Sequence, residues 1–368
     1  MKLALVVPGG VDRSGERRVI PCLLWLIERL VASGDEVHVF VLGQEPEPGE
    51  WRLLGARVRN AGRRPRRFRT LVDLAAEHRR GSFDVVHAFW AAGPGAVAAL
   101  FGRLTGTPVV LTLPGGDLSA LADIGYGARL TPGGRFWTRL ALAGARRVVV
   151  QSDWMAQQAR AFGVETVRIP FGVALDRWPA APPRPRTPGT PLRLAHVANL
   201  NRVKDQETLL RAMRASRDRG VDWRLDIVGQ DTLDGAVQRR CAALGLADLV
   251  TFHGFLPHAD TRPVVEAADL MVVSSRHEAG PLVVLEAAVA GLPTVGTRVG
   301  HIADWAPEAA IATPIGDPEA LAEAISRLAA DEPERLRLAR AAQALALAED
   351  ADATAALMRR VYVEVAAR

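Results

Sequence analysis

The chain has 368 residues, which is too long for one ordinary hydrophobic core, so two domains are expected. Hydrophobic residues make up 49% and charged residues 24%, as in a globular protein rather than a disordered or fibrous one. The two cysteines, Cys22 and Cys241, have neither a metal-ligand spacing nor a disulfide pattern, which fits a reducing cytoplasm. The first apolar stretch is too short for a signal peptide and no stretch reaches transmembrane length, so a soluble or at most peripheral protein is expected.

The net charge is +5, and one stretch of the chain concentrates arginine. Its members are Arg63, Arg64, Arg66, Arg67 and Arg69. The preferred interpretation of this stretch is a solvated loop. A weak peripheral contact with an anionic membrane is the second interpretation, since each base near such a surface contributes about 1 kcal/mol. Nucleic acid is not expected as a partner, because no aromatic residues alternate with these arginines and no known nucleic-acid-binding motif accompanies them. The expected location is the cytoplasm, with the inner face of the membrane as the place of any peripheral contact.

Along the first half of the chain, short apolar runs alternate with amphipathic or alanine-rich segments of helical period. The expected strands are residues 3–7, 36–41, 85–88, 109–113, 148–151 and 166–169. Strands that alternate with helices predict a parallel sheet that is covered by helices on both faces.

Proline interrupts this pattern between residues 178 and 191, where a semi-rigid linker is expected instead of regular structure. The alternation then resumes. The expected strands are residues 192–197, 224–228, 249–252, 270–273 and 294–296. The predicted division is an N-terminal domain (1–177), the linker (178–191), a C-terminal domain (192–350) and a terminal helix within 351–368 that packs back on the first domain. The predicted fold class is α/β, with two doubly wound parallel sheets that face a central cleft and gather ligands at the carboxyl ends of their strands.

The loop after the first strand contains Gly9 and Gly10, and glycine lets a backbone approach a phosphate-bearing ligand closely. The loop lacks the Gly-x-Gly-x-x-Gly spacing of a redox dinucleotide site and the lysine of an ATPase phosphate loop. Neither class of protein is therefore indicated.

Residues 274–295 are the most informative segment of the chain. An apolar strand precedes the segment, and Pro281 within it suits the first position of a helix. Glu278 is then expected in the loop that enters the helix, and Glu286 about one and a half turns inside it. Backbone groups at 279–283 surround the positive end of the helix, which favours an anion such as a diphosphate. The two carboxylates are suited to accept hydrogen bonds from vicinal hydroxyls of a sugar.

This segment resembles the donor-site signature of the retaining glycosyltransferases of family 4, which have two Rossmann-like domains in the arrangement called GT-B. The resemblance extends in order over nearly the whole chain, and its specific motifs lie at 195–205 and 274–295. It implies that Glu278 lies beside the donor sugar as a catalytic residue and that Glu286 binds the nucleotide ribose.

The resemblance also implies a diphosphate site and a pocket for the nucleotide base. The candidate diphosphate-binding residues are Lys204, Arg202, Asn199, Gly280, Pro281, Leu282, Val283, Gly9 and Gly10. The candidate base-pocket residues are Gly229, Phe255 and Leu256. His277 is a candidate contact of the sugar or of a phosphate.

The chain departs from the family pattern at two positions of the loop before residue 206. Asn199 stands where the family usually has an arginine for the diphosphate, and Asp205 stands where a glycine is usual. Lys204 matches the family lysine, and Arg202 is the nearby cation that is expected to supply the missing charge.

A further departure lies in the N-terminal half, where Pro114 occupies the position of a histidine that many members carry. Asp117 of the same loop is retained. Asp117 and His87 are the candidate catalytic residues of this half, although a lone histidine at the end of a strand is more often structural.

The resulting hypothesis is a retaining glycosyltransferase that moves a sugar from a nucleotide-diphosphate sugar to a lipid-linked, polysaccharide or small-molecule acceptor. The cations and the helix end are expected to stabilise the leaving diphosphate without a metal ion, and no cofactor is expected. Two alternatives stay open. One is a non-catalytic sugar-nucleotide-binding module or subunit of a larger glycosyltransferase, and the other is a sugar-nucleotide epimerase of the same architecture.

Overall fold

The computed structural model describes residues 1–63 and 65–367, so Arg64 of the arginine-rich stretch lies outside the described residues. The chain forms two compact units, one of Met1–Phe171 and Ala351–Arg368 and one of Gly172–Asp350. The division therefore precedes the proline-rich segment, whose residues belong to the second unit. Across the described part of the chain, no helix combines the length and the apolar character that crossing a membrane requires.

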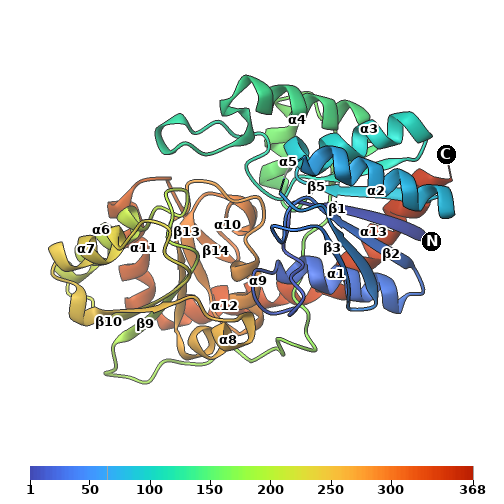
Figure 1. The fold of residues 1–368 in the computed structure, drawn as a ribbon. Coiled ribbons are helices and arrows are strands. Elements are labelled where there is room, and N and C mark those ends of the chain that lie inside the picture. Colours follow the sequence, from blue (N-terminus) through green and yellow to red (C-terminus); the bar gives the residue numbers. More distant parts are fainter. Residues whose placement is uncertain (64, 368) are drawn as a thin grey trace. The chain divides into compact units, whose positions relative to one another are not determined.

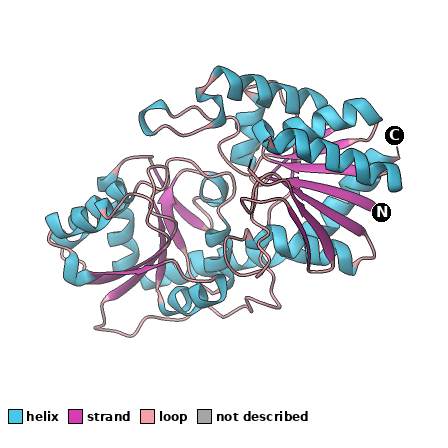
Figure 2. Cartoon of the chain, viewed as in Figure 1, coloured by secondary structure: helices cyan, strands magenta, loops and turns pink. Residues whose placement is uncertain are grey.

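Each unit contains a sheet with helices on both faces (Figures 1 and 2). The strands of the first unit are β1 (Lys2–Val7), β2 (Glu36–Val41), β3 (Gly49–Leu53), β4 (Ala56–Asn60), β5 (Val85–Phe89), β6 (Val109–Thr112), β7 (Arg147–Val150) and β8 (Val167–Arg168). They lie in the order β3-β4-β2-β1-β5-β6-β7-β8. All neighbours pair in parallel except β3 and β4, among the strands of the described residues.

The antiparallel β3–β4 hairpin at the edge of this sheet was not predicted. Its turn is formed by Leu54 and Gly55, whose φ angles of 49° and 82° are both in the left-handed region. Glu50 and Arg59 form an ion pair across the two strands, at 2.7 Å. Charged residues interrupt the apolar alternation of both strands. Leucine in the turn is also not typical of a hairpin, so the sequence does not indicate one clearly here.

The helices of the first unit cover both faces of the sheet. They are α1 (Pro21–Ala32), α2 (Arg66–Arg80), α3 (Ala96–Thr105), α4 (Pro132–Gly144), α5 (Asp153–Arg160) and α13 (Ala351–Ala366), with a π-helical turn (Ala91–Gly95) and short 3-10 turns (Ala122–Ile124 and Ala128–Leu130). The terminal helix α13 lies beside α1, and both pack on one face of the sheet around Leu3 and Leu5 (Figure 1). Helices α2 and α3 cover the other face, where the rings of Phe40, Phe83 and Phe101 are in edge contact.

The second unit has a fully parallel sheet. Its strands are β9 (Leu192–Val197), β10 (Trp223–Val228), β11 (Val250–Gly254), β12 (Leu270–Val273), β13 (Thr294–Thr297) and β14 (Ala310–Thr313). Their order is β11-β10-β9-β12-β13-β14, which is the Rossmann order. Successive strands are added on one side of β9 up to β11 and on its other side from β12 onward, so the strand order reverses between β9 and β12. The prediction of two doubly wound parallel sheets is thereby confirmed, and β14 is an additional short strand that the sequence analysis did not include.

The helices of the second unit are α6 (Gln206–Asp218), α7 (Ala236–Ala243), α8 (His258–Ala267), α9 (Leu282–Val289), α10 (Gly300–Trp305), α11 (Pro318–Ala330) and α12 (Glu332–Ala348), with a 3-10 turn (Ala247–Leu249). Helices α6, α7 and α11 share one hydrophobic cluster with the sheet, built on residues such as Leu194, Leu225 and Val295. On the other side, α8 contacts β9, and α9 contacts β13 and α12.

The proline-rich segment 178–191 contains neither a helix nor a strand, but it is anchored to the second unit. The buried guanidinium of Arg335 donates to the carbonyl oxygens of Arg184 and Asp269, at 2.6 and 3.0 Å. The indole of Trp178 is also buried. These contacts explain why the segment is part of the second unit and is not the separate linker that the sequence predicted.

Candidate active site

Two functional loops meet at the point of the second sheet where the strand order reverses. The loop after β9 carries Lys204, and the loop after β12 carries Glu278. The Lys204 Nζ atom lies 2.5 Å from Glu278 Oε1, and the Ser275 hydroxyl donates to the same oxygen at 2.6 Å. Ligands of open α/β sheets bind at this switch point, outside the carboxyl ends of the strands. The structure therefore brings together two residues that are 74 positions apart in the chain and that the sequence analysis had assigned to one ligand.

Backbone contacts hold these two loops against each other. The Ser274 hydroxyl donates to the Lys204 carbonyl at 2.8 Å, and the Arg276 N–H donates to the Val203 carbonyl at 2.7 Å. The Lys204 N–H is also bound by the Asn201 side chain at 3.1 Å. The position of the ammonium group is therefore set by both loops.

Asp205 explains one of the departures from the family pattern. Its φ and ψ angles of 50° and 54° lie in the left-handed region, which glycine adopts most readily and aspartate tolerates better than most residues. Its carboxylate accepts from the Thr208 N–H and hydroxyl, at 3.3 and 2.7 Å, and so caps helix α6. Aspartate thus keeps the backbone shape that glycine would provide and adds a helix cap.

A neutral histidine, His196, connects the strand before the Lys204 loop to the helix after it. His196 Nδ1 donates to the Val272 carbonyl at 2.9 Å, so its Nε2 accepts from the Gln206 amide at 3.2 Å. Burial lowers the pKa of His196 to about 4. Gln206 donates in addition to the Asn199 carbonyl at 3.2 Å, which joins the strand end, the loop and the start of α6.

The two other candidate diphosphate residues of this loop differ in their contacts. The side-chain oxygen of Asn199 accepts from the Gln230 N–H at 3.1 Å, so this oxygen ties the loop to the one that follows β10. Arg202 is exposed and has no acidic partner within residues 1–63 and 65–367. Asn199 is therefore used in the structure of the loop, whereas Arg202 offers a positive charge without an acidic partner among the described residues.

Gly229 follows β10 and is fixed by a close approach of two loops. A Cβ atom at this position would lie 1.9 Å from the Ala198 carbonyl oxygen, and the φ angle of Gly229 is 154°. The Gly229 N–H donates to the Gly254 carbonyl at 2.9 Å, which connects the loop to the predicted base pocket. The predicted role of Gly229 in binding the base stays a prediction, but its need for glycine follows from the backbone.

Replacing Gly229 with alanine is expected to lower the free energy of unfolding by about 2–3 kcal/mol, because the backbone must shift to admit the methyl group. Urea denaturation measures this loss. Gly220→Ala is the matched control, since Gly220 also has a positive φ angle, of 85°, but nothing lies within 4 Å of its added Cβ. Equal losses for the two variants would show that the close approach to Ala198 has no energetic weight.

Glu286 lies inside α9 with its side chain almost fully buried. Its Oε1 atom is 2.5 Å from His258 Nε2, at the start of α8. The Trp178 indole donates to the Glu286 carbonyl at 3.1 Å, and its ring lies 5.0 Å from the His258 ring. The predicted ribose-binding carboxylate is therefore held by a histidine that the sequence analysis missed. A signal was present, because His258 follows directly after the predicted base-pocket loop.

The start of α9 differs in one detail from the expectation. The helix begins at Leu282, and Pro281 is its N-cap in an extended conformation instead of its first helical residue. Proline has no N–H, so Pro281 cannot donate to a phosphate as the other residues at 279–283 can. The N–H groups of Leu282 and Val283 belong to the first turn, which has no acceptors for them within the helix. The correction removes Pro281 as a donor and leaves Gly280, Leu282 and Val283 as predicted ones.

The predicted base-pocket loop lies between β11 and α8. Phe255 is 50% exposed and Leu256 is half-buried. Because the loop leads directly into His258, the predicted base pocket adjoins the predicted ribose site. His277, next to Glu278, is buried, and burial lowers its pKa. Its contact with sugar or phosphate stays a prediction.

In the first unit, His87 has a structural environment. Its Nδ1 atom lies 2.6 Å from the Tyr362 hydroxyl of α13, and its Nε2 atom lies 2.7 Å from the Thr112 hydroxyl. Burial lowers the pKa of His87 to about 3. The ring is thus neutral, enclosed and occupied at both nitrogens. These contacts argue against the predicted catalytic role and assign His87 to the attachment of the terminal helix.

Asp117 occupies a different setting, in the loop that follows β6. Its Oδ1 atom accepts from the Ala91 N–H at 2.6 Å, and burial raises the pKa of Asp117 to about 6 although this hydrogen bond favours the charged form. Trp90, which precedes Ala91, has a φ angle of 69°, and this angle is strained for an aromatic residue. The carboxyl of Asp117 therefore fixes an unusual turn at the ligand edge of this sheet.

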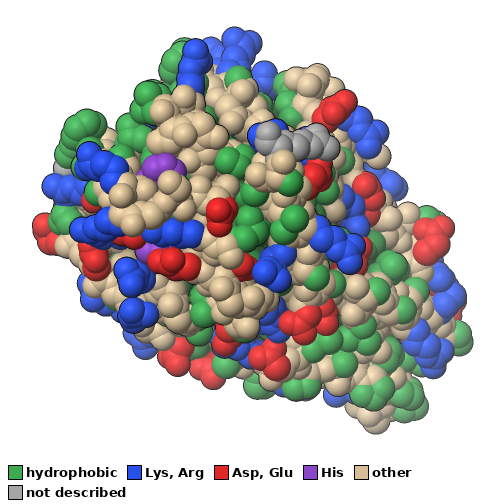
Figure 3. Space-filling model, turned by 90° about the vertical axis from the view of Figure 1, so that its right-hand side faces the viewer, with side chains coloured by type: hydrophobic (Ala, Val, Ile, Leu, Met, Phe, Trp, Pro, Cys, Tyr) green, Lys and Arg blue, Asp and Glu red, His purple; other side chains and the backbone are tan. Residues whose placement is uncertain are grey.

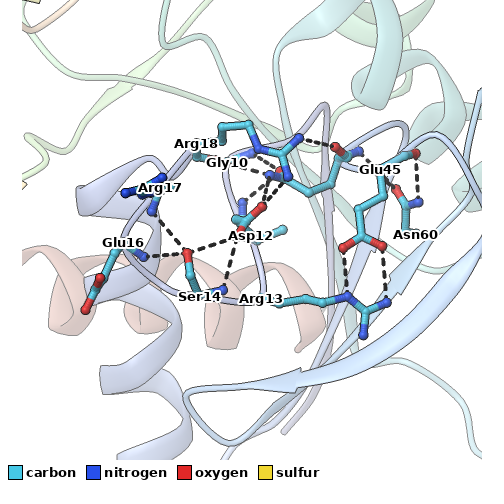
Figure 4. A network of polar contacts seen from close by, with 11 residues as sticks. Gly10, Asp12, Arg13, Ser14, Glu16, Arg17, Arg18, Glu45 and Asn60 are labelled. Atoms are coloured by element: carbon cyan, nitrogen blue, oxygen red, sulfur yellow. Dashed lines mark hydrogen bonds and ion pairs between the residues drawn. The ribbon is translucent and has the colours of Figure 1, made fainter. Parts of the chain in front are cut away.

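The glycine loop after β1 is braced by a polar network (Figure 4). Gln44 Oε1 accepts from the Gly10 and Val11 N–H groups, at 2.7 and 3.2 Å. Asp12 accepts from Arg18 at 2.6 Å in the same network. Because the Gly10 N–H is already bound, it is not available as the predicted diphosphate donor. Gly9 stays a predicted contact.

Comparison with known proteins places these features in a family. Residues 180–345 match the family described as Glycosyl transferases group 1, and residues 19–172 match the Glycosyl transferase 4-like domain. The chain belongs to the group 1 glycosyltransferases.

Two curated relatives of this glycosyltransferase have different activities. The chain is 27% identical to the D-inositol 3-phosphate glycosyltransferase of Arthrobacter sp. (strain FB24), over 80% of the chain and 76% of that protein. It is 25% identical to the glycogen synthase of Mycobacterium tuberculosis (strain CDC 1551 / Oshkosh), over 75% of the chain but only 65% of that protein. The chain thus spans less than two thirds of the second relative.

Solved structures support the fold. Sucrose-phosphate synthase from Thermosynechococcus elongatus has a TM-score of 0.82 at 21% identity, with both chains fully covered. The Anabaena protein HepE, in complex with UDP and glucose, has a TM-score of 0.75 at 17% identity, with 99% of this chain and all of that chain covered.

One group of side chains in this glycosyltransferase has the spacing of a metal site. The described residues include Glu36, His38 and Glu77, whose ligand atoms lie within 4.8 Å of one another. Glu77 is also bonded to Lys2 and Arg80, both at 3.2 Å, so cations of the protein already compensate it. Glu36 begins β2, which places the group at the edge of the first sheet opposite the carboxyl ends of the strands. The group is therefore not part of the candidate active site.

Proposed function

We propose that this glycosyltransferase moves a sugar from a nucleotide-diphosphate sugar to an acceptor with retention of configuration and without a metal ion. The observation that carries the proposal is the contact of Lys204 with Glu278 at the switch point of the second sheet, with Glu286 on the helix that follows. A cation, a nearby carboxylate and a second carboxylate deeper in the helix suit the three parts of such a donor, which are diphosphate, sugar and ribose.

Lys204 and Glu278 neutralise each other in the structure of the protein alone, at 2.5 Å. A bound diphosphate offers Lys204 a second anionic partner, and a charge-assisted bond of this kind contributes about 1.5–3 kcal/mol. Glu278 then faces the sugar, whose ring gains positive character as the bond to the leaving phosphate breaks. Both interactions strengthen towards the transition state, which is what increases turnover.

Charge compensation by protein groups supports metal independence. Lys204 and the exposed Arg202 lie on the loop after β9, and the positive end of α9 lies on the loop after β12. Together they supply the charge that a divalent ion supplies in other phosphate-transfer sites.

The relatives support a nucleotide-sugar donor and leave the acceptor unassigned. HepE was solved in complex with UDP and glucose, and this supports a uridine nucleotide as the first donor to test. The acceptor classes expected from the sequence, lipid-linked, polysaccharide and small-molecule, stay predictions, because the two curated relatives have different names for their activities.

The decisive experiment is incubation of the protein with UDP, GDP, ADP and TDP sugars without an acceptor, in the presence of a metal chelator. Slow release of the nucleoside diphosphate is expected from one donor class. Tight binding without release would instead indicate a binding module, and conversion of the donor sugar without release would indicate an epimerase. With an acceptor in hand, the anomeric configuration of the product by NMR tests retention.

Glu286→Ala is expected to weaken binding of the free nucleoside diphosphate about tenfold to a hundredfold, because the ribose hydroxyls lose a charged acceptor. Isothermal calorimetry measures the affinity. Glu323→Ala, on an exposed position of α11, is the control and is expected to bind like the parent protein. An unchanged affinity of the Glu286 variant would remove this residue from the nucleotide site.

A further inference from the structure

Helices α2, α3 and α4 of the first unit present large apolar side chains to water. Phe68 is 67% exposed, Leu104 is 69% exposed and Phe136 is 60% exposed. Two less exposed members, Val72 and Leu100, are 46% and 40% exposed. One exposed apolar residue is ordinary on a soluble protein, but five on three neighbouring helices form a candidate interaction surface.

The three helices are neighbours on one face of the first sheet (Figure 1). Helix α3 contacts both α2 and α4. The Arg67 guanidinium of α2 lies over the Trp137 ring of α4, at 4.7 Å from its centre, and the Phe136 ring is 5.0 Å from the Trp137 ring. The exposed apolar side chains therefore lie on three helices that contact one another.

The exposed charges of this region are basic. We define the α2–α4 face by its exposed residues, which are Arg66, Phe68, Arg69, Val72, Leu100, Arg103, Leu104, Arg135, Phe136 and Arg139. None of its five arginines forms an ion pair with an acidic residue within the described part of the chain. Helices α3 and α4 contain no acidic residue, and α2 contains Asp73 and the buried Glu77. In Figure 3, basic and hydrophobic side chains lie next to one another along the top of the molecule, at the height of α3 and α4 in Figure 1.

We propose that the α2–α4 face docks on the surface of a membrane that contains anionic phospholipids. Helices that face only water usually mix acidic with basic residues, whereas helices that lie on a membrane combine basic residues with exposed Phe and Leu. The arginines match the negative charge of the headgroups, and the apolar side chains reach the boundary of the acyl chains. A nucleic acid would match the arginines but would leave the apolar side chains without a partner.

A cavity next to the α2–α4 face has matching chemistry. It has a volume of about 800 Å³, opens to solvent, and is lined by Arg139, Arg146, Arg147 and Phe162, with Glu165 as the acid in its wall. Arg147 is paired with Glu364, at 2.5 Å, whereas Arg139 and Arg146 have no acidic partner within the described residues. Because Arg139 belongs to both the cavity and the face, a phosphate-bearing headgroup can be held at the margin of the docked surface.

The inference concerns the first unit only and does not rest on the proposed transfer reaction. Its test is cosedimentation of the full chain with vesicles of phosphatidylcholine, with or without phosphatidylglycerol, at low and high salt. Binding is expected only with the anionic vesicles and is expected to weaken as salt is added, because salt screens the arginines.

Two variants separate the apolar and the basic contributions. Phe68→Ser combined with Leu104→Ser is expected to reduce binding at least tenfold, because two side chains no longer enter the interface. Arg103→Gln combined with Arg139→Gln is expected to reduce it about fivefold for each charge removed. These positions are exposed, so circular dichroism is expected to show unchanged folding.

Matched variants on other surfaces complete the test. Val363→Ser removes an apolar residue that is 57% exposed on α13, on the opposite face of the sheet. Arg211→Gln combined with Arg360→Gln removes two exposed charges outside the face. Both are expected to bind vesicles like the parent protein. The proposal is overturned if the parent does not sediment with anionic vesicles, if it binds only a soluble polyanion such as heparin, or if the control variants lose as much binding as the face variants.

Discussion

Glu278→Gln is expected to lower turnover about a hundredfold or more while the affinity for the free nucleoside diphosphate changes little. Glutamine preserves the size of the side chain and an acceptor oxygen, so Lys204 and Ser275 keep a partner at this position. What is lost is the negative charge that favours a sugar ring with positive character. The loss is therefore concentrated in the transition state, and saturating donor cannot restore the rate.

The measurement is donor hydrolysis or transfer at saturating donor, together with calorimetric titration of the nucleotide. Glu323→Gln, at an exposed position of α11, controls for the loss of one charge elsewhere in the same unit. The opposite pattern, with lost nucleotide binding and normal turnover at saturation, would mean that Glu278 and Glu286 have each other's roles.

The elements around the candidate site could be predicted because local and global signals agree there. The run at 270–273 is a buried strand in both sequence and structure, and the segment after it forms a loop and a helix. The family resemblance assigned Lys204 and Glu278 to one site, and the order of the parallel strands places their loops side by side. Once β9 and β12 flank the reversal of the sheet, their following loops converge at one edge.

The residues that sequence analysis missed or misjudged depend on long-range contacts. His258 approaches Glu286 from another helix, and the sequence signal for His258, its place directly after the base-pocket loop, does not identify Glu286 as its partner. His87 was a candidate catalytic residue at the end of a strand, but Tyr362 reaches it from a helix 275 positions later. A short motif cannot reveal a partner that the tertiary fold supplies, and such partners decide whether a polar side chain is available to a ligand.

Backbone geometry accounts for a second group of differences. Asp205 was recognised as a departure from glycine, but its left-handed conformation and its capping of α6 were not predicted. Gly10 was expected to approach a phosphate, whereas its N–H is used by Gln44 from the loop after β2. In both cases the residue type showed that the backbone is unusual there, and only the hydrogen bonds showed what the unusual backbone is for.

Lys204→Ala is expected to lower turnover about a hundredfold or more and to weaken nucleotide binding about tenfold. The ammonium group opposes the charge of the diphosphate in the bound state, and this charge increases as the bond to the sugar breaks, so the effect on turnover exceeds the effect on binding. The substitution also removes the cation that lies 2.5 Å from Glu278, which leaves Ser275 as its remaining side-chain partner on this oxygen. Urea denaturation therefore has to accompany the kinetics, so that a loss of folded protein is not counted as a loss of catalysis.

Two further variants decide whether the charge itself is responsible. Lys204→Arg keeps a cation on the same loop and is expected to recover part of the lost nucleotide affinity, although the larger guanidinium does not reproduce the position of the ammonium group. Arg211→Ala removes an exposed cation from the following helix, α6, and is expected to leave both constants unchanged. If Lys204→Ala retains parental turnover at saturating donor, the leaving diphosphate is stabilised elsewhere. Arg202 and the first turn of α9 would then be the groups to test, because both carry positive charge on the two loops of the candidate site.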